Sequence, residues 1–236
     1  MGAIFRRELK AYFTSPVAYI FIAVFYVYTA NYFVNYNMAA GSADMSYVFA
    51  GAFVIMMILL PLLTMRLMSE DKKQRTDQCL LTAPVSLGGI VAGKFFAAVC
   101  IFLAAMAIYV PYVLVVYSLA GTVEWATVIG TMAALLLLGS SFISIGIFVS
   151  SLTESQVVAA IVSFIINMFF YMLDMFASSV SNEFISGIMV SMGFYTRYNE
   201  FTTGVFDLSS VLFFVSTIFI FNFLTVRVLE KRRWAE

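Results

Sequence analysis

The stretch WATVIGTMAALLLLGSSFISIGIFVSSLT, residues 125–153, contains no charged side chain. A helix needs about 20 mostly apolar residues to cross a hydrocarbon core roughly 30 Å thick, so this stretch can hold one membrane span. Backbone polar groups must be paired within the segment in hydrocarbon, which favours a helix. Five more uncharged stretches share this property: 11–43, 45–65, 95–123, 155–173 and 208–226. The sequence therefore predicts an all-α integral membrane protein with six spans.

The overall composition agrees with this fold class. Of the 236 residues, 63% are hydrophobic and 11% are charged, whereas soluble domains are about a quarter charged. The formal net charge of zero provides no field that would attract nucleic acid. The absence of histidine excludes histidine acid–base catalysis, Ser-His-Asp triads and HExxH zinc sites. Cys79 and Cys100 lack the spacing of a metal site. We expect a single transmembrane domain, 1–236, that is not an enzyme and binds no metal.

The cations predict the orientation of the chain. We place membrane helices at 16–38, 47–67, 88–118, 125–150, 156–177 and 208–228. An even number of spans puts both termini on one side of the membrane. All but one of the 13 cations then fall on that side, and Arg197 is the exception. Because Lys and Arg are concentrated in cytoplasmic connections, we predict a multi-pass protein of the cell (inner or plasma) membrane with both termini in the cytoplasm.

Residues 2–14 have the pattern of an amphipathic helix. The apolar side chains Ile4, Phe5, Leu9, Tyr12 and Phe13 fall on one helical face, and Arg6, Arg7 and Lys10 fall on the other. This pattern predicts an interfacial helix on the inner leaflet, with the three cations as membrane-interface anchors. The alternative is a simple cationic flank of the first span.

The connection at 69–86, SEDKKQRTDQCLLTAPVS, is the one sizeable cytoplasmic connection between predicted spans. It carries charges of both signs and ends in an apolar pair before Ala83-Pro84. We predict a short helix stopped by Pro84. A solvated charge run is the alternative to a docking element for a cytoplasmic partner.

Residues 178–207, on the outer side, are too apolar for a free loop. The apolar side chains that keep a helical rhythm are Phe184, Ile185, Ile188, Met189, Met192 and Tyr195. We predict short extracytoplasmic helices packed at the outer rim, with a re-entrant arrangement as an alternative, because irregular backbone is not tolerated in lipid. Asp174 should lie near the outer end of the fifth span and face water.

The sequence contains no complete motif for nucleotide binding or intramembrane proteolysis. Gly88 to Lys94 matches the glycine and lysine positions of a phosphate-binding loop, but Phe95 replaces the serine or threonine that would hold magnesium. We predict instead that Gly89 and Gly93 serve helix packing and that Lys94 extends to the cytoplasmic interface. The sequence also lacks the GxGD and GxSxG motifs of intramembrane proteases.

Several stretches resemble the type-2 ABC transporter permeases (ABC-2 type), and most closely the branch with the gliding-motility and copper-enzyme-maturation permeases. They are 8–19 (ELKAYFTSPVAY), 61–67 (PLLTMRL), 70–73 (EDKK), 76–78 (TDQ), 80–85 (LLTAPV), 195–201 (YTRYNEF), 204–208 (GVFDL) and 232–234 (RRW). Many members carry Gly before the Thr of the TDQ stretch, where this chain has Arg75. The resemblance covers nearly the whole chain.

The resemblance implies a permease half that pairs with a second, identical or different, half and docks a separate ABC ATPase subunit. The connection after the second span would be the coupling helix that contacts the ATPase. Its candidate residues are Glu70, Lys72, Lys73, Thr76, Asp77 and Gln78. ATP and magnesium would bind the ATPase, and this chain would bind no cofactor. The resemblance leaves the substrate and the cavity-lining residues open.

Three functions remain open at this point. The first is an ATP-driven exporter. The second is a mechanical transmitter, in which the ATPase acts through this chain on an extracytoplasmic auxiliary protein and nothing crosses the membrane. The third is an ion-coupled carrier or channel, which the lack of a charge at mid-membrane disfavours.

Overall fold

The structure, a computed structural model, is all-helical in the residues that it describes, which are 1–76, 85–121, 124–177, 179–180 and 182–233. The elements in chain order are α1 (Gly2–Thr14), α2 (Pro16–Phe33), the π-helix η1 (Val34–Met38), α3 (Ser46–Thr64), α4 (Arg66–Lys73), α6 (Leu87–Met106), α7 (Tyr109–Ala120), α8 (Trp125–Leu152), α9 (Gln156–Ala177), α10 (Glu183–Met192), α11 (Phe194–Thr202) and α12 (Leu208–Arg233). Six of the described helices are long and apolar enough to cross a membrane. The predicted fold class is confirmed.

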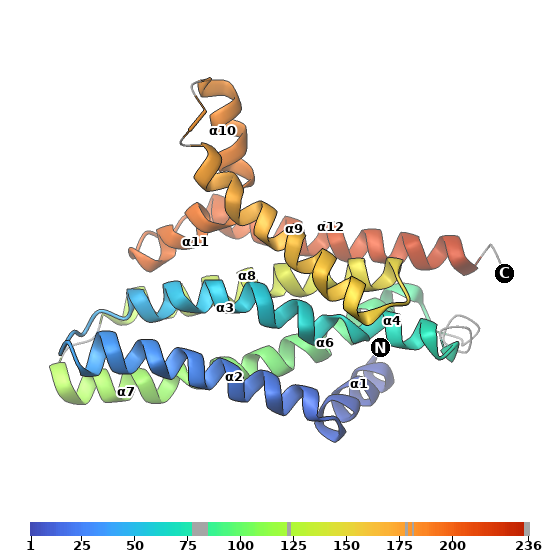
Figure 1. The fold of residues 1–236 in the computed structure, drawn as a ribbon, viewed down its shortest axis with the longest axis horizontal. Helices are drawn as coiled ribbons and strands as arrows, with labels where there is room; N and C mark the ends of the chain where they lie inside the picture. The colour runs from blue at the N-terminus through green and yellow to red at the C-terminus, as the bar shows by residue number, and fades with distance from the viewer. Residues whose placement is uncertain (77–84, 122–123, 178, 181, 234–236) are drawn as a thin grey trace.

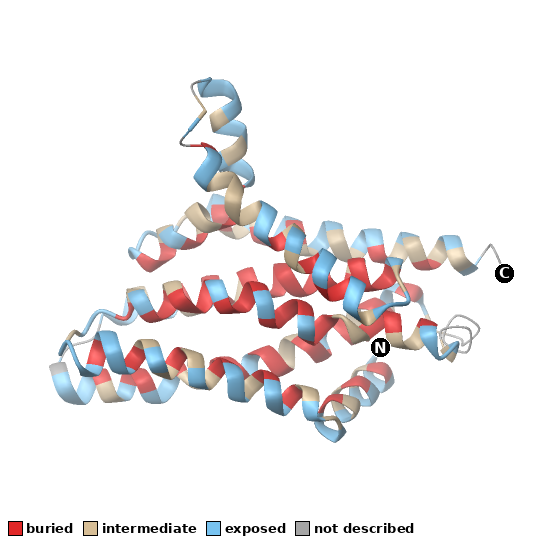
Figure 2. Ribbon diagram, viewed as in Figure 1, coloured by how far each residue is buried: buried red, intermediate tan, exposed pale blue. Residues whose placement is uncertain are grey.

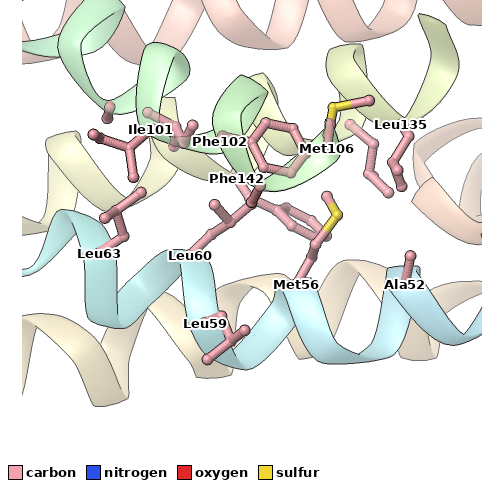
Figure 3. Packing of buried hydrophobic residues seen from close by; sticks show 14 of the residues in the cluster. Ala52, Met56, Leu59, Leu60, Leu63, Ile101, Phe102, Met106, Leu135 and Phe142 are labelled. Atoms are coloured by element: carbon pink, nitrogen blue, oxygen red, sulfur yellow. The ribbon is translucent and has the colours of Figure 1, made fainter. Parts of the chain in front are cut away.

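The core lies where α3 and α8 run side by side, with α6 packed against α8 (Figure 1). Side chains of the three helices interdigitate there, as Figure 3 shows for Leu60, Phe102 and Phe142, all fully buried. Close approach of α8 to α3 requires Gly146, because a Cβ at this position would come within 2.0 Å of Thr64 Oγ1. The small residue in α8 thus sets how closely the two central helices pack.

The peripheral helices α2, α9 and α12 turn long apolar faces outward (Figure 2). In α9, for example, Val157, Ile165 and Phe169 are more than half exposed. An apolar helix face outside the core is expected where lipid or another membrane chain is the neighbour, since lipid tails are as apolar as leucine.

The third span is broken where Pro111 removes a backbone donor. The proline ring cannot donate to the carbonyl of Ala107, and the helix is interrupted at Ala107–Ile108, between α6 and α7. The amide of Val110 donates to the Ala107 carbonyl instead, at 3.2 Å. The span therefore consists of two helical parts.

The surface helix α1 occupies the range expected from its amphipathic pattern and packs on α6. Gly93 allows this contact, because a Cβ there would lie 3.1 Å from Ile4 Cγ2. The predicted packing role of Gly93 is thus confirmed. The face of α1 that is buried is formed by Ile4, Glu8 and Tyr12, so an acid lies among the apolar contacts.

The two ends of the bundle differ in charge. We call one the charged end: it contains α1, α4, the start of α6 and the last turns of α12 (Figure 1). The opposite end contains η1, α7, α10 and α11. The helix α10 stands away from the bundle on the end of α9 and has no buried residue. The short helices predicted between the fifth and sixth spans are confirmed as α10 and α11.

Candidate functional site

The charged helix α4 is a direct continuation of α3 that is fixed by α8. The Ser150 hydroxyl of α8 accepts hydrogen bonds from the backbone amides of Met68 and Ser69, each at 3.0 Å, and donates to the carbonyl of Met65 at 2.9 Å. One hydroxyl can donate once and accept twice, so its capacity is used in full. The start of α4 is therefore held by α8 and not by the helical ladder alone.

Lys94 of α6 lies at the centre of a buried ionic cluster. Its Nζ is 2.9 Å from Glu8 Oε1 of α1, 2.6 Å from Asp71 Oδ2 of α4, and 2.5 Å from the carbonyl oxygen of Leu67. The lysine side chain is only 1% exposed, so the predicted extension to the membrane interface is wrong. A buried ammonium group is tolerated only when paired, and here two carboxylates and a carbonyl accept from it.

Arg7 completes what we call the Lys94 cluster, namely Arg7, Glu8, Asp71 and Lys94. Its Nη2 lies 2.6 Å from Glu8 Oε1 and 3.5 Å from Asp71 Oδ2. Partial burial would lower the pKa of Arg7, but the two carboxylates outweigh it and raise that pKa above its ordinary value. The cluster thus balances two cations against two anions and joins α1, α4 and α6.

A second set of contacts ties the junction of α1 and α2 to α4. Arg66 donates to Ser15 Oγ at 2.7 Å, lies 5.4 Å from the ring centre of Tyr12 and pairs with Glu70 at 3.4 Å. The Tyr12 hydroxyl donates to the carbonyl of Leu63 at 2.8 Å. Burial raises the pKa of Tyr12, against the opposing charge of Arg66, so the hydroxyl keeps the proton that it donates.

The candidate coupling residues differ in exposure. Lys73 is exposed, and Glu70 is half-buried. Lys72 is buried, and its Nζ donates to the carbonyl of Ser151 at the last turn of α8, where the helix dipole favours a cation. In this conformation the charge of Lys72 therefore points into the protein. Asp77 and Gln78 lie outside the described residues.

Thr76 connects the candidate coupling segment to the Lys94 cluster. Its hydroxyl contacts Asp71 Oδ1 at 3.0 Å and the carbonyl of Asp71 at 3.3 Å. Asp71 was not among the predicted coupling residues. The helical spacing could have placed Asp71 toward the protein. It follows the buried Leu67 by one helical turn and so lies on the same face of α4.

The helix α4 ends at a left-handed residue. Arg75 has φ 55°, and it is the only non-glycine residue in the described part of the chain with a positive φ. Its amide donates to the carbonyl of Lys72 at 3.0 Å. This is the position where many related permeases carry glycine. The charged helix thus spans Arg66–Lys73, whereas the prediction placed it at 69–86; Pro84, the expected stop, lies outside the described residues.

The membrane-interface anchors are divided by the fold. Arg6 and Lys10 are exposed on α1, whereas Arg7 also belongs to the Lys94 cluster. The lysine of the loop-like Gly88–Lys94 motif is engaged by two carboxylates, which leaves it no role with a nucleotide phosphate. Within the described residues, no group of three or more His, Cys, Asp or Glu side chains could hold a metal ion.

At the opposite end, Asp174 is a structural cap and not an acid facing only water. Its carboxylate accepts from the amides of Tyr195 and Thr196 at 2.9 and 3.3 Å, and from the Thr196 hydroxyl at 2.8 Å. Free amides at a helix start need such acceptors, so Asp174 fixes α11 to the end of α9.

Comparison with known families gives one match. Residues 3–210 match the family model described as ABC-2 family transporter protein. No curated protein matches the chain. The matched range contains the whole Lys94 cluster and the candidate coupling segment.

Proposed function

This chain belongs to the ABC-2 family of transporter proteins, and from this premise we propose that it is one permease half of an ATP-driven exporter. It is a multi-pass membrane protein and a permease subunit of an ABC transporter. We further propose that it pairs with a second permease half, and that separate ABC ATPase subunits bind on the cytoplasmic side and supply the hydrolysis. In this proposal the charged end faces the cytoplasm, because Lys and Arg are concentrated there.

The observation that carries the proposal is the connection between the coupling segment and the membrane helices. The exposed Lys73, with Glu70, would contact the ATPase, together with Asp77 and Gln78. A push on this segment would pass from Thr76 to Asp71 and from there to Lys94 of α6 and Glu8 of α1. Ligand-driven motion requires contacts that differ between two states, and ion pairs that exchange partners can provide them.

A charge-reversal experiment tests the docking surface. We expect Lys73→Glu to reduce the amount of ABC ATPase that co-purifies with the tagged chain and to reduce the ATP hydrolysis of the complex. Lys10→Glu is the matched control, because it reverses an exposed cation at the same end outside the segment. An ATPase that binds and is stimulated equally well by the Lys73→Glu chain would show that the docking assignment is wrong.

A second candidate function, mechanical transmission, is favoured by α10. This helix stands off the opposite end with Phe184 at 76% exposed and Ile185 and Ile188 about half exposed. An apolar element presented in this way suits contact with an extracytoplasmic protein. Flux of a substrate through the reconstituted complex would favour export. ATP-dependent crosslinking from position 184 to another protein, without flux, would favour transmission.

A further inference from the structure

An apolar groove runs between α6 and α12 near the charged end. Its volume is about 440 Å³. Val91, Phe95 and Phe96 line it from α6, and Ile218, Phe219 and Phe223 line it from α12. Phe219 is 71% exposed, so the groove opens sideways toward the lipid. Its wall chemistry suits a hydrocarbon chain and offers little to a polar solute.

A second hollow of about 610 Å³ continues from the end of this groove. It is lined by Ser86 and Leu87 at the start of α6 and by Glu230 and Arg233 near the end of α12. Gly88 and Val226 line both hollows. A Cβ on Gly88 would meet no atom within 4 Å, so the missing side chain leaves the passage between them open.

The charges of the second hollow favour an anion. Arg227 lies 2.6 Å from Glu230 and neutralises it. Arg233 forms no ion pair within the described residues, and it ends a helix whose last turn carries three cations. Arginine is well suited to phosphate because its fork of donors matches phosphate oxygens. Among the described residues, the hollow therefore offers one positive charge without an ion-pair partner, together with the hydroxyl of Ser86.

The length of the groove matches one leaflet of a bilayer. A helix rises 1.5 Å per residue, so Val215 and Val226, which both line the groove, are separated by roughly 16 Å along α12. Half of a hydrocarbon core about 30 Å thick has nearly the same length. A polar hollow at one end and an apolar groove of this length have the proportions of a lipid headgroup and one acyl chain.

We propose that an anionic phospholipid occupies the joined hollows, with its phosphate at Arg233 and Ser86 and one acyl chain in the groove between α6 and α12. Basic pockets between membrane helices at the cytoplasmic surface are a known mode of headgroup binding. The lipid would brace α12 against α6. This site requires neither the ATPase nor transport, so its test is independent of the proposed function.

Native mass spectrometry of the delipidated full chain tests the site with phosphatidylglycerol, phosphatidylethanolamine and inorganic phosphate as probes. We expect the wild-type chain to retain phosphatidylglycerol over phosphatidylethanolamine and not to retain inorganic phosphate. Gly88→Leu places a side chain in the opening between the two hollows, at a helical position where leucine causes no backbone strain. It should reduce the amount of retained phosphatidylglycerol at least several-fold. Gly130→Leu is the matched control, because its Cβ also meets no atom within 4 Å.

The charge is tested separately. Arg233→Gln should lower phosphatidylglycerol retention roughly fivefold, the effect of about one cation near a membrane surface. Lys231→Gln removes an exposed cation of the same helical turn that lines neither hollow, and should lower the retention less. Equal retention by the Gly88→Leu and Gly130→Leu chains would overturn the proposal. So would a Gly88→Leu chain that changes only its oligomeric state, since a second copy would then fill the groove. Inorganic phosphate bound as tightly as lipid would also overturn it.

Discussion

The two ends of the bundle hold their helices together by different chemistry. At the charged end, α1, α4 and α6 meet through full charges that are removed from water, with Lys94 between Glu8 and Asp71. At the opposite end, the described contacts of α11 include no ion pair: the carboxylate of Asp174 meets only neutral donors, and the other contacts include hydroxyl groups and backbone carbonyls. The Tyr198 hydroxyl donates to the carbonyl of Phe49 at 2.9 Å, and the Thr131 hydroxyl donates to that of Phe201 at 3.0 Å.

This difference determines how each end responds to the loss of one partner. Removal of one member of a buried ion pair leaves an uncompensated charge, which costs far more than a lost neutral hydrogen bond. The two ends also differ in the number of partners that each group can reach. The carboxylates of the Lys94 cluster have two cations within reach, whereas each hydroxyl at the opposite end has a single carbonyl acceptor across the helix contact.

The largest effect is expected from Lys94→Met. This change leaves Glu8 and Asp71 next to each other with Arg7 as their remaining cation, and should lower the free energy of unfolding by about 3–5 kcal/mol. Thermal unfolding of the purified chain in detergent measures it. The triple variant Glu8→Gln/Asp71→Asn/Lys94→Met removes the stranded charges and should regain most of the loss. If Lys94→Met were as stable as the wild-type chain, the buried ion pairs would not make the charged end more sensitive to a lost partner than the opposite end.

Ser150→Ala tests whether the charged end also depends on neutral contacts. The change leaves the buried amides of Met68 and Ser69 without their acceptor and should cost about 1–3 kcal/mol. Ser151→Ala is the matched control, because that hydroxyl bonds only to Phe148 of its own helix. Thermal unfolding of both variants gives the comparison. Equal effects would mean that α8 does not hold α4.

The spans were predictable from sequence because a membrane helix needs only its own residues to be recognised. An uncharged stretch such as 125–153 has one stable arrangement in hydrocarbon, whatever its neighbours are. The helical spacing of apolar side chains located α1 and α10, and this pattern is also read from a single segment. These predictions succeed because the constraint is local in sequence and general in its physics.

The contacts of single charges were not predictable in this way. Lys94 lies near the charged end of its span, and a lysine at the end of a span normally extends to water. It is buried because Glu8 and Asp71, which are 86 and 23 positions away in sequence, approach from two other helices. Asp174 lies near the end of the fifth span as predicted, but its contacts were not predicted, since its partners Tyr195 and Thr196 belong to a separate helix. Only the packing of helices determines these pairings.

At the opposite end, Asp174→Ala should lower the free energy of unfolding less than Lys94→Met does, and at most about as much as Ser150→Ala does. It removes the acceptor for the first amides of α11 and should cost about 0.5–2 kcal/mol, the usual value of a helix cap. Asp174→Asn keeps an acceptor oxygen and should cost less. Thermal unfolding distinguishes the two variants, and an asparagine as harmful as alanine would show that charge matters at this end too.

The smallest effect compares two turns, each with a residue of positive φ. Arg75 at the charged end has φ 55°, and Gly204 at the opposite end has φ 81°. A left-handed conformation costs an ordinary residue roughly 1–2 kcal/mol, whereas extra freedom of glycine in the unfolded chain costs about 0.4–1 kcal/mol. Arg75→Gly should therefore stabilise the chain by about 0.5–1 kcal/mol, and Gly204→Ala should destabilise it. Gln74→Gly, at a right-handed position, should also destabilise it. If Arg75→Gly instead lowered the unfolding temperature, the contacts of the arginine side chain would stabilise the charged end by more than the left-handed backbone destabilises it.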